Sequence, residues 1–117
     1  MSEPMSIEPV EMRAPRGGTT LEIAWSDGAV SRYPHAILRG FCPCAHCQGH
    51  QGPVGWAAEA TDADLAILEI EEVGNYAVRL VFADGHSTGI YSFRFLRDLA
   101  VVAEMPVEKA KTMRLSR

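Results

Sequence analysis

The sequence predicts one α+β domain, built from a small antiparallel sheet of about five strands and two helices. Apolar and polar residues alternate in several short segments, as they do in strands with one buried face. Asp27-Gly28 and Asp84-Gly85 are typical of the tight turns that join antiparallel strands. Near the end of the chain the apolar residues recur at helical spacing instead. These patterns together predict hairpins covered by helices.

The first half predicts a hairpin and a short helix. We expect a strand over 19–25 and, across the first Asp-Gly turn, a second strand over 29–33. A helix over 35–39 follows, because a proline suits its first turn and Gly40 has the backbone freedom to end it. We expect His35 to be exposed at the start of this helix.

The second half predicts the same order with one more strand. Alternation indicates strands over 65–73, 76–82 and 86–91, separated by two turns. A helix over 93–104 follows, and Ser92 is suited to cap its first turn. Phe93 and Phe95 cannot both face inward from one helix, so we expect one of them to line a partner surface.

The two halves also resemble each other in sequence. The matching residues are Trp25-Ser26-Asp27-Gly28, Tyr33 and Leu38-Arg39 in the first half, and Phe82-Ala83-Asp84-Gly85, Tyr91 and Leu96-Arg97 in the second. If the similarity is a true repeat, it predicts two strand–turn–strand–helix modules that share a sheet. The alternative is chance, since Asp-Gly hairpins are common.

Length and charge bound the classes of protein. The 117 residues suit one domain, and we expect a disordered leader over 1–18, the folded domain over 19–105 and a flexible basic tail over 106–117. The 11 Lys and Arg against 15 Asp and Glu disfavour nucleic-acid binding by bulk electrostatics. No apolar run reaches the about 18 residues of a membrane span. Because no secretory signal is recognised, we expect a cytoplasmic protein.

All three cysteines lie within Cys42–Cys47, in the pattern Cys-x-Cys-x-x-Cys directly after the first helix. They are too close together for a disulfide framework, whereas a tight turn brings three sulfurs within reach of one ion. Structural zinc takes four thiolate or imidazole ligands. A fourth ligand from His86 would bridge the two halves and is favoured, while His50 and His46 stay open as alternatives. The sequence therefore predicts a zinc knuckle.

Other readings of the cysteines compete with zinc. They could be small buried hydrophobic residues without a metal. They could also hold an iron–sulfur cluster, for which one chain is a cysteine short unless a histidine or a second chain completes the set. A cysteine nucleophile would need a free thiol and a free base beside it. Neither the thiol nor the base is left once the thiols and His86 bind metal. Asp27 and Asp84 are explained by their turns. We therefore expect no enzyme activity.

In their order along the chain, these residues resemble the γ-butyrobetaine hydroxylase-like N-terminal domain. The motifs that carry the resemblance over about residues 19–103 are Leu21–Gly28, Leu38-Arg39, Cys42–Cys47, Asp84–His86, Tyr91 and Leu96-Arg97. The resemblance implies that zinc is bound by three cysteines and a histidine, here Cys42, Cys44, Cys47 and His86. It implies the accessory domain and not the hydroxylase, because the sequence lacks the His-x-Asp of the iron triad.

Similar domains occur alone in bacteria and fused to P-loop iron–sulfur scaffold proteins. We therefore expect a non-catalytic zinc-binding accessory or adaptor domain that binds a protein partner, such as a dioxygenase or a P-loop iron–sulfur scaffold. We expect no binding to nucleic acid or membrane, and a homodimer stays open. The alternative is an iron–sulfur cluster assembly or carrier factor that uses the same thiolates.

Overall fold

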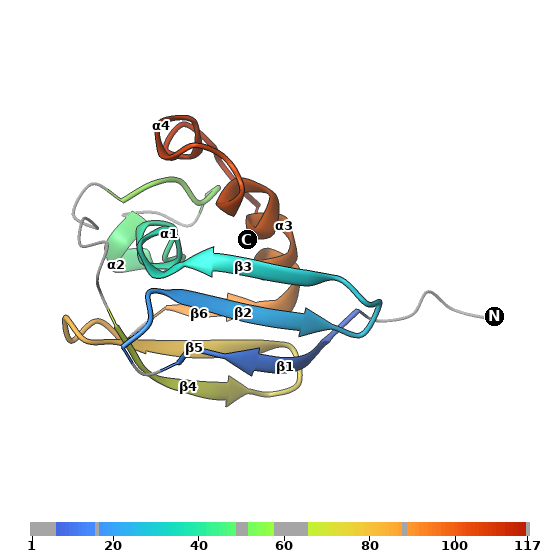
Figure 1. Ribbon diagram of the computed structural model, residues 1–117. Coiled ribbons are helices and arrows are strands. Elements are labelled where there is room, and N and C mark those ends of the chain that lie inside the picture. Colours follow the sequence, from blue (N-terminus) through green and yellow to red (C-terminus); the bar gives the residue numbers. More distant parts are fainter. Residues whose placement is uncertain (1–6, 16, 49–51, 58–65, 88, 117) are drawn as a thin grey trace.

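A computed structural model describes residues 7–15, 17–48, 52–57, 66–87 and 89–116. The described chain forms an α+β fold with two antiparallel sheets, in the strand orders β1-β2-β3 and β4-β5-β6 (Figure 1). The elements are β1 (Pro9–Arg13), β2 (Thr20–Trp25), β3 (Val30–Pro34), α1 (His35–Gly40), α2 (Ala45–Gln48), β4 (Ile67–Val73), β5 (Ala77–Phe82), β6 (Ile90–Ser92), α3 (Phe93–Ala103) and α4 (Val107–Ala110). The α+β class is confirmed, with six strands in two sheets rather than about five in one. No helix in the described ranges is long and apolar enough to cross a membrane.

The strand missing from the prediction is β1. It pairs antiparallel with β2, so that Met12 lies opposite Ile23 and Arg13 opposite Glu22. The expectation of a disordered leader over 1–18 is therefore wrong for Pro9–Arg13, whereas residues 1–6 lie outside the described part. β1 forms although its own sequence pattern is weak, because pairing with β2 supplies its backbone hydrogen bonds. Such pairing overrides strand propensity.

The C-terminal segment packs on the core over its described residues 106–116, which corrects the prediction of a flexible tail over 106–117 for that part. Ala110 of α4 is fully buried. Leu115 and Val54 exchange two backbone hydrogen bonds of 2.7 and 2.8 Å. The ammonium group of Lys111 lies 5.4 Å from the ring centroid of Trp56. The prediction was based on the basic charges of the segment. It was wrong because a few apolar residues between these charges pack against the core.

One hydrophobic core joins the two sheets and α3. β2 turns Leu21, Ile23 and Trp25 into this core, as the alternation predicts. In Figure 1 the β1–β2–β3 sheet lies in front of the other sheet. His35 is almost fully buried, so the expectation that it is exposed is wrong. The tertiary packing of α1 decides this burial.

The second module follows the predicted order with shorter elements. The Ser92 hydroxyl accepts the backbone N–H of Phe95 at 3.0 Å and caps α3, as predicted. β6 begins at Ile90 and not at residue 86. The carbonyl of His86 accepts the Phe82 N–H to close the turn after β5, and the paired strand starts only at Ile90, opposite Arg79. Phe95 faces the core, whereas Phe93 is half-buried.

The sequence repeat is a repeat in the structure. Asp27 and Asp84 each accept the backbone N–H of the residue two positions on, at 3.1 and 2.9 Å. Each aspartate also pairs with the arginine of the other half: Arg97 binds Asp27, and Arg39 binds Asp84, both at 3.0 Å. The modules are therefore linked by reciprocal ion pairs, although each module has its own sheet.

Two tyrosines repeat this exchange. The Tyr33 hydroxyl donates to the carbonyl of Leu96, and the Tyr91 hydroxyl donates to the carbonyl of Leu38, both at 2.6 Å. Both side chains are fully buried. Each tyrosine thus donates to a carbonyl in the helix of the other module. The Tyr91 bond joins β6 to α1, the helix that leads into the cysteines, and the Tyr33 bond joins β3 to α3.

Candidate metal centre

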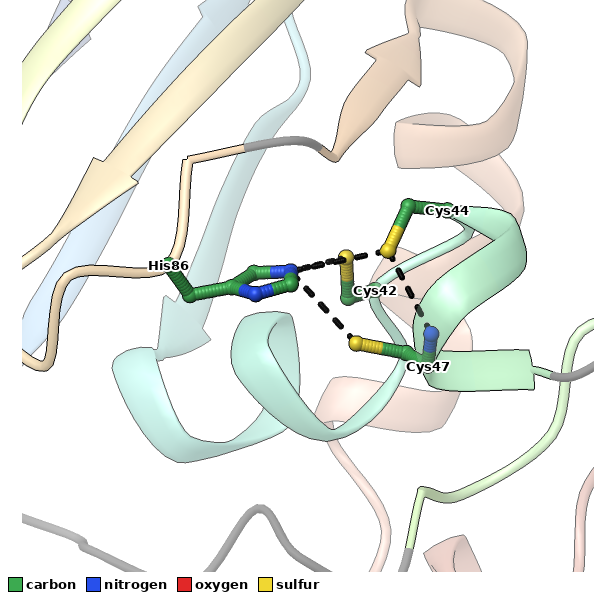
Figure 2. A group of neighbouring side chains, drawn as sticks. All are labelled: Cys42, Cys44, Cys47 and His86. Carbon is green, nitrogen blue, oxygen red and sulfur yellow. Dashed lines mark hydrogen bonds between the residues drawn. The ribbon is translucent and has the colours of Figure 1, made fainter.

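The three cysteines lie at the junction of α1 and α2. Cys42 follows the last turn of α1, and its backbone N–H donates to the carbonyl of Arg39 at 3.3 Å. Cys44 precedes α2, and its sulfur accepts the backbone N–H of Cys47 at 3.4 Å. This tight turn places the three thiols on one side of the junction, toward the loop between β5 and β6 (Figure 2).

His86 reaches the thiols from the second module. The turn after β5 is closed by a 2.9 Å bond from the Phe82 N–H to the His86 carbonyl. Oδ1 of Asp84 accepts the His86 N–H at 2.9 Å. With its backbone held at both ends, the histidine points its imidazole at the three sulfurs (Figure 2).

The four side chains fit one tetrahedral ion. Nε2 of His86 lies 3.1 Å from the sulfur of Cys42, 3.6 Å from that of Cys44 and 3.4 Å from that of Cys47. All four candidate ligand atoms lie within 4.8 Å of one another. Zinc bonds of about 2.3 Å to sulfur and about 2.0 Å to nitrogen give a tetrahedral N···S separation of about 3.5 Å. The observed distances are close to this value.

The environment of the thiols favours a bound cation. Burial raises the pKa of Cys42 well above its usual range. Burial, followed by the hydrogen bond with Cys44, raises the pKa of Cys47. Several neighbouring thiolates are unfavourable in this half-buried place, and a divalent cation is the charge that lets them ionise together. The donor set therefore fits a soft or borderline metal ion.

Two polar side chains support the centre and were not assigned to it from the sequence. The Gln48 amide donates to the carbonyls of Cys42 and Gly55 at 2.9 and 3.0 Å, and accepts the Gly55 N–H at 3.0 Å. Arg39 donates to Asp84 at 3.0 Å and to the sulfur of Cys47 at 3.3 Å. The place of Arg39 in the sequence repeat could have indicated its role. No feature of the sequence indicates the role of Gln48.

The structure thus brings together Cys42, Cys44, Cys47 and His86, the set that the resemblance implied. His50 and the side chain of His46 lie outside the described part. The alternatives in which one of them supplies the fourth ligand are therefore not tested. Asp27 and Asp84 are held in their turns, as expected.

Fold and site together define a small α+β domain with a Cys₃His candidate metal centre that joins two modules. The model of the family described as "Gamma-butyrobetaine hydroxylase-like, N-terminal" matches residues 12–97. The chain belongs to this family. No curated protein matches the sequence.

Three solved structures have a similar fold. One is the crystal structure of a protein of unknown function of the DUF971 family from Acidithiobacillus ferrooxidans. It is 35% identical, with a TM-score of 0.63 over 80% of this chain and 92% of that one. An NMR solution structure is 34% identical, with a TM-score of 0.67 over 86% of this chain and 74% of its own. A second NMR structure, 23% identical with a TM-score of 0.69 over 88% and 80% of the chains, shows the fold alone.

Proposed function

We propose that this chain is a non-catalytic zinc-binding accessory or adaptor domain, whose metal is structural and whose role is to bind a protein partner. The observation that carries the proposal is the set of four donors within 4.8 Å of one another, three sulfurs and one imidazole nitrogen. Such a set fills the tetrahedral positions of zinc and leaves none for a substrate. A closed site of this kind stabilises a fold rather than performing chemistry.

The spacing of the donors supports a single ion over an iron–sulfur cluster. A four-iron cluster binds each thiolate through a different iron atom, so its ligand sulfurs are spread more widely than those around one ion. The ligand atoms here converge on one point. Zinc would join the α1–α2 junction to the β5–β6 loop and hold the two modules together.

A surface that is not lined by the candidate ligands supports the adaptor role. A hollow of about 260 Å³ lies between β1 and the β4–β5 pair and is lined by Val10, Ile70 and Phe93. Phe93 also lines a second hollow of about 490 Å³, beside Ile7 and Tyr76. We name these two hollows the Phe93 groove. Val10 of the first hollow and Tyr76 of the second are 69% and 56% exposed, so each hollow presents a large exposed hydrophobic residue.

The charges of the Phe93 groove indicate the partner. The groove carries Glu8, Glu11 and Glu72 against Arg94, and Glu11 pairs with Arg13 at 2.7 Å, so a small excess of negative charge remains. Complementary charge favours encounter with a positively charged segment. We therefore propose that the groove binds an extended peptide segment of a partner protein, with apolar side chains and flanking lysines or arginines.

Metal content tests the first part of the proposal. The protein is purified untagged and without oxygen, and its metals are measured by mass spectrometry beside a visible spectrum. One zinc per chain without a visible band is expected. Iron with sulfide and a brown colour would replace the proposal with the iron–sulfur assembly or carrier role, and a metal-free protein would overturn both.

Peptide selection tests the second part. Peptides from a random library are selected on the zinc-loaded chain and measured against a Phe93→Glu variant. A Val101→Glu variant is the matched control, because Val101 is exposed on α3 and does not line the groove. Basic, apolar peptides that lose binding to Phe93→Glu alone are expected. Peptides that bind both variants equally would contradict the groove as the docking site.

A further inference from the structure

Arg39 lies between the two segments that carry the candidate ligands. Its Nε donates to Oδ2 of Asp84 at 3.0 Å, and its Nη1 donates to the sulfur of Cys47 at 3.3 Å. Its side chain is only 13% exposed. Asp84 uses its other oxygen, Oδ1, to accept the backbone N–H of His86. The guanidinium group therefore contacts one ligand directly and a second ligand through one carboxylate.

We propose that Arg39 is the counter-ion of the metal centre: it offsets the negative charge of the metal-bound thiolates at Cys47 and holds the turn that carries His86. This inference rests on the proposed binding of a metal by the Cys₃His set. Arg39 is a positioning residue and not a ligand, since guanidinium has donors and no acceptor.

The charge balance of the centre supports this role. Three thiolates, a neutral imidazole and a divalent cation leave one net negative charge. In a half-buried place such a charge is costly unless it is paired and hydrogen-bonded. One guanidinium in contact with a ligand sulfur offsets part of this charge, because Arg39 also pairs with Asp84. A hydrogen bond to an ionised acceptor is stronger than one between neutral groups.

The other half of the molecule contains the same ion pair, and among the described residues no cluster of candidate metal ligands lies there. Arg97 binds Asp27 at 3.0 Å, and its guanidinium lies 5.2 Å from the ring centroid of Trp25. Where the second module has His86 after the turn, the first has Ala29. Arg97 thus makes the reciprocal link between modules but contacts an aromatic ring instead of a sulfur. It is the matched control for Arg39.

The experiment compares zinc affinity in the full chain for Arg39→Gln and Arg97→Gln, by competition with a chromophoric chelator. Loss of an outer-shell partner typically weakens metal binding by about 10- to 100-fold. We expect this loss in Arg39→Gln, unchanged affinity in Arg97→Gln, and similar losses of metal-free stability in both. Arg39→Lys should recover part of the affinity, because it keeps the charge but not the two-sided fork.

The outcomes separate this inference from the proposed function. If the unaltered chain binds no zinc, the proposed function and the inference both fail. If it binds zinc and the two glutamine variants lose affinity equally, Arg39 acts only through the fold and the inference is overturned.

A second measurement tests the inference in case a glutamine variant does not fold. Alkylation of Cys47 by iodoacetamide is followed by mass spectrometry in the zinc-loaded Arg39→Lys and Arg97→Lys chains. Faster modification in Arg39→Lys alone supports the inference, because lysine keeps the positive charge but cannot donate to Asp84 and Cys47 with the geometry of a guanidinium, so the metal-bound sulfur is less well shielded. Equal rates overturn it.

Discussion

The backbone of Gly89 lies against the sulfur of Cys42. A β-carbon added at Gly89 would be 2.5 Å from that sulfur and 3.0 Å from the ring of Tyr91. This contact places the start of β6 directly behind the most buried of the candidate ligands. Glycine is therefore needed at this position for a close approach and not for an unusual backbone angle.

Gly89→Ala should consequently weaken both the fold and metal binding. The added methyl group must displace Cys42 or Tyr91, and such overpacking costs about 1–3 kcal/mol. Chemical denaturation with and without zinc measures both effects. Gly28→Ala is the control, because Gly28 has a φ of 92° and no atom within 4 Å of an added β-carbon. It should lose stability through backbone strain and keep its zinc affinity, and an equal affinity loss in both variants would contradict the prediction.

The ligand assignment predicts a sharp division among the cysteines and histidines. Cys44→Ser and His86→Ala should lose most of the metal and unfold at much lower temperature, because structural zinc contributes on the order of 10 kcal/mol in small domains. His50→Ala should retain both metal and stability. Metal content and thermal denaturation provide the measurements. If His50→Ala alone strips the metal, the site that bridges the two modules is wrong.

The buried tyrosines predict a loss of stability in alkali. Burial raises the pKa of Tyr33 to about 12, whereas an unfolded tyrosine ionises near pH 10. A raised folded pKa contributes stability that is complete below about pH 10 and is lost as the pH rises toward 12. Urea denaturation at pH 8 and pH 11 should show this loss, and Tyr33→Phe should reduce it. An unchanged pH dependence in Tyr33→Phe would contradict the assignment.

At pH 8, Tyr33→Phe and Tyr91→Phe should each cost about 1 kcal/mol, because each removes one buried hydrogen bond between the modules. Denaturant midpoints measure the cost. Tyr76→Phe is the control, since Tyr76 is exposed. A cost at Tyr76 as large as at the two buried tyrosines would show that the exchanged hydrogen bonds contribute nothing particular.

The first Asp-Gly turn predicts a loss of folding stability at low pH, in contrast to the loss in alkali predicted for Tyr33. The backbone N–H of Ala29, together with Arg97, lowers the pKa of Asp27 against the smaller opposing effect of desolvation. A lowered folded pKa contributes stability above the unfolded value of about 3.9, and this stability is lost as the pH falls below it. Asp27→Asn should flatten this part of the acid unfolding curve. A curve identical to that of the unaltered chain would show that the carboxylate does not contribute.

Much of the fold follows from short stretches of sequence. The Asp-Gly turns, the alternation in β2 and β5 and the Ser92 cap depend on residues a few positions apart, and each is found where the pattern predicts it. The close spacing of the cysteines likewise predicts one ion, since a single tight turn gathers them. His86 was favoured because the second turn would carry it toward the first module, which its hydrogen bonds to the turn support.

The sequence by itself therefore determined the turns, the central strands, the capped helix and the cysteine cluster. Only the tertiary structure decided that β1 pairs with β2, that the strands divide into two sheets, and that the basic C-terminal segment packs on the core. It also decided that Arg39 contacts Cys47 and that Gly89 lies against Cys42. The reason is physical: these features depend on hydrogen bonds and contacts between distant segments, which leave little periodic pattern in either segment alone.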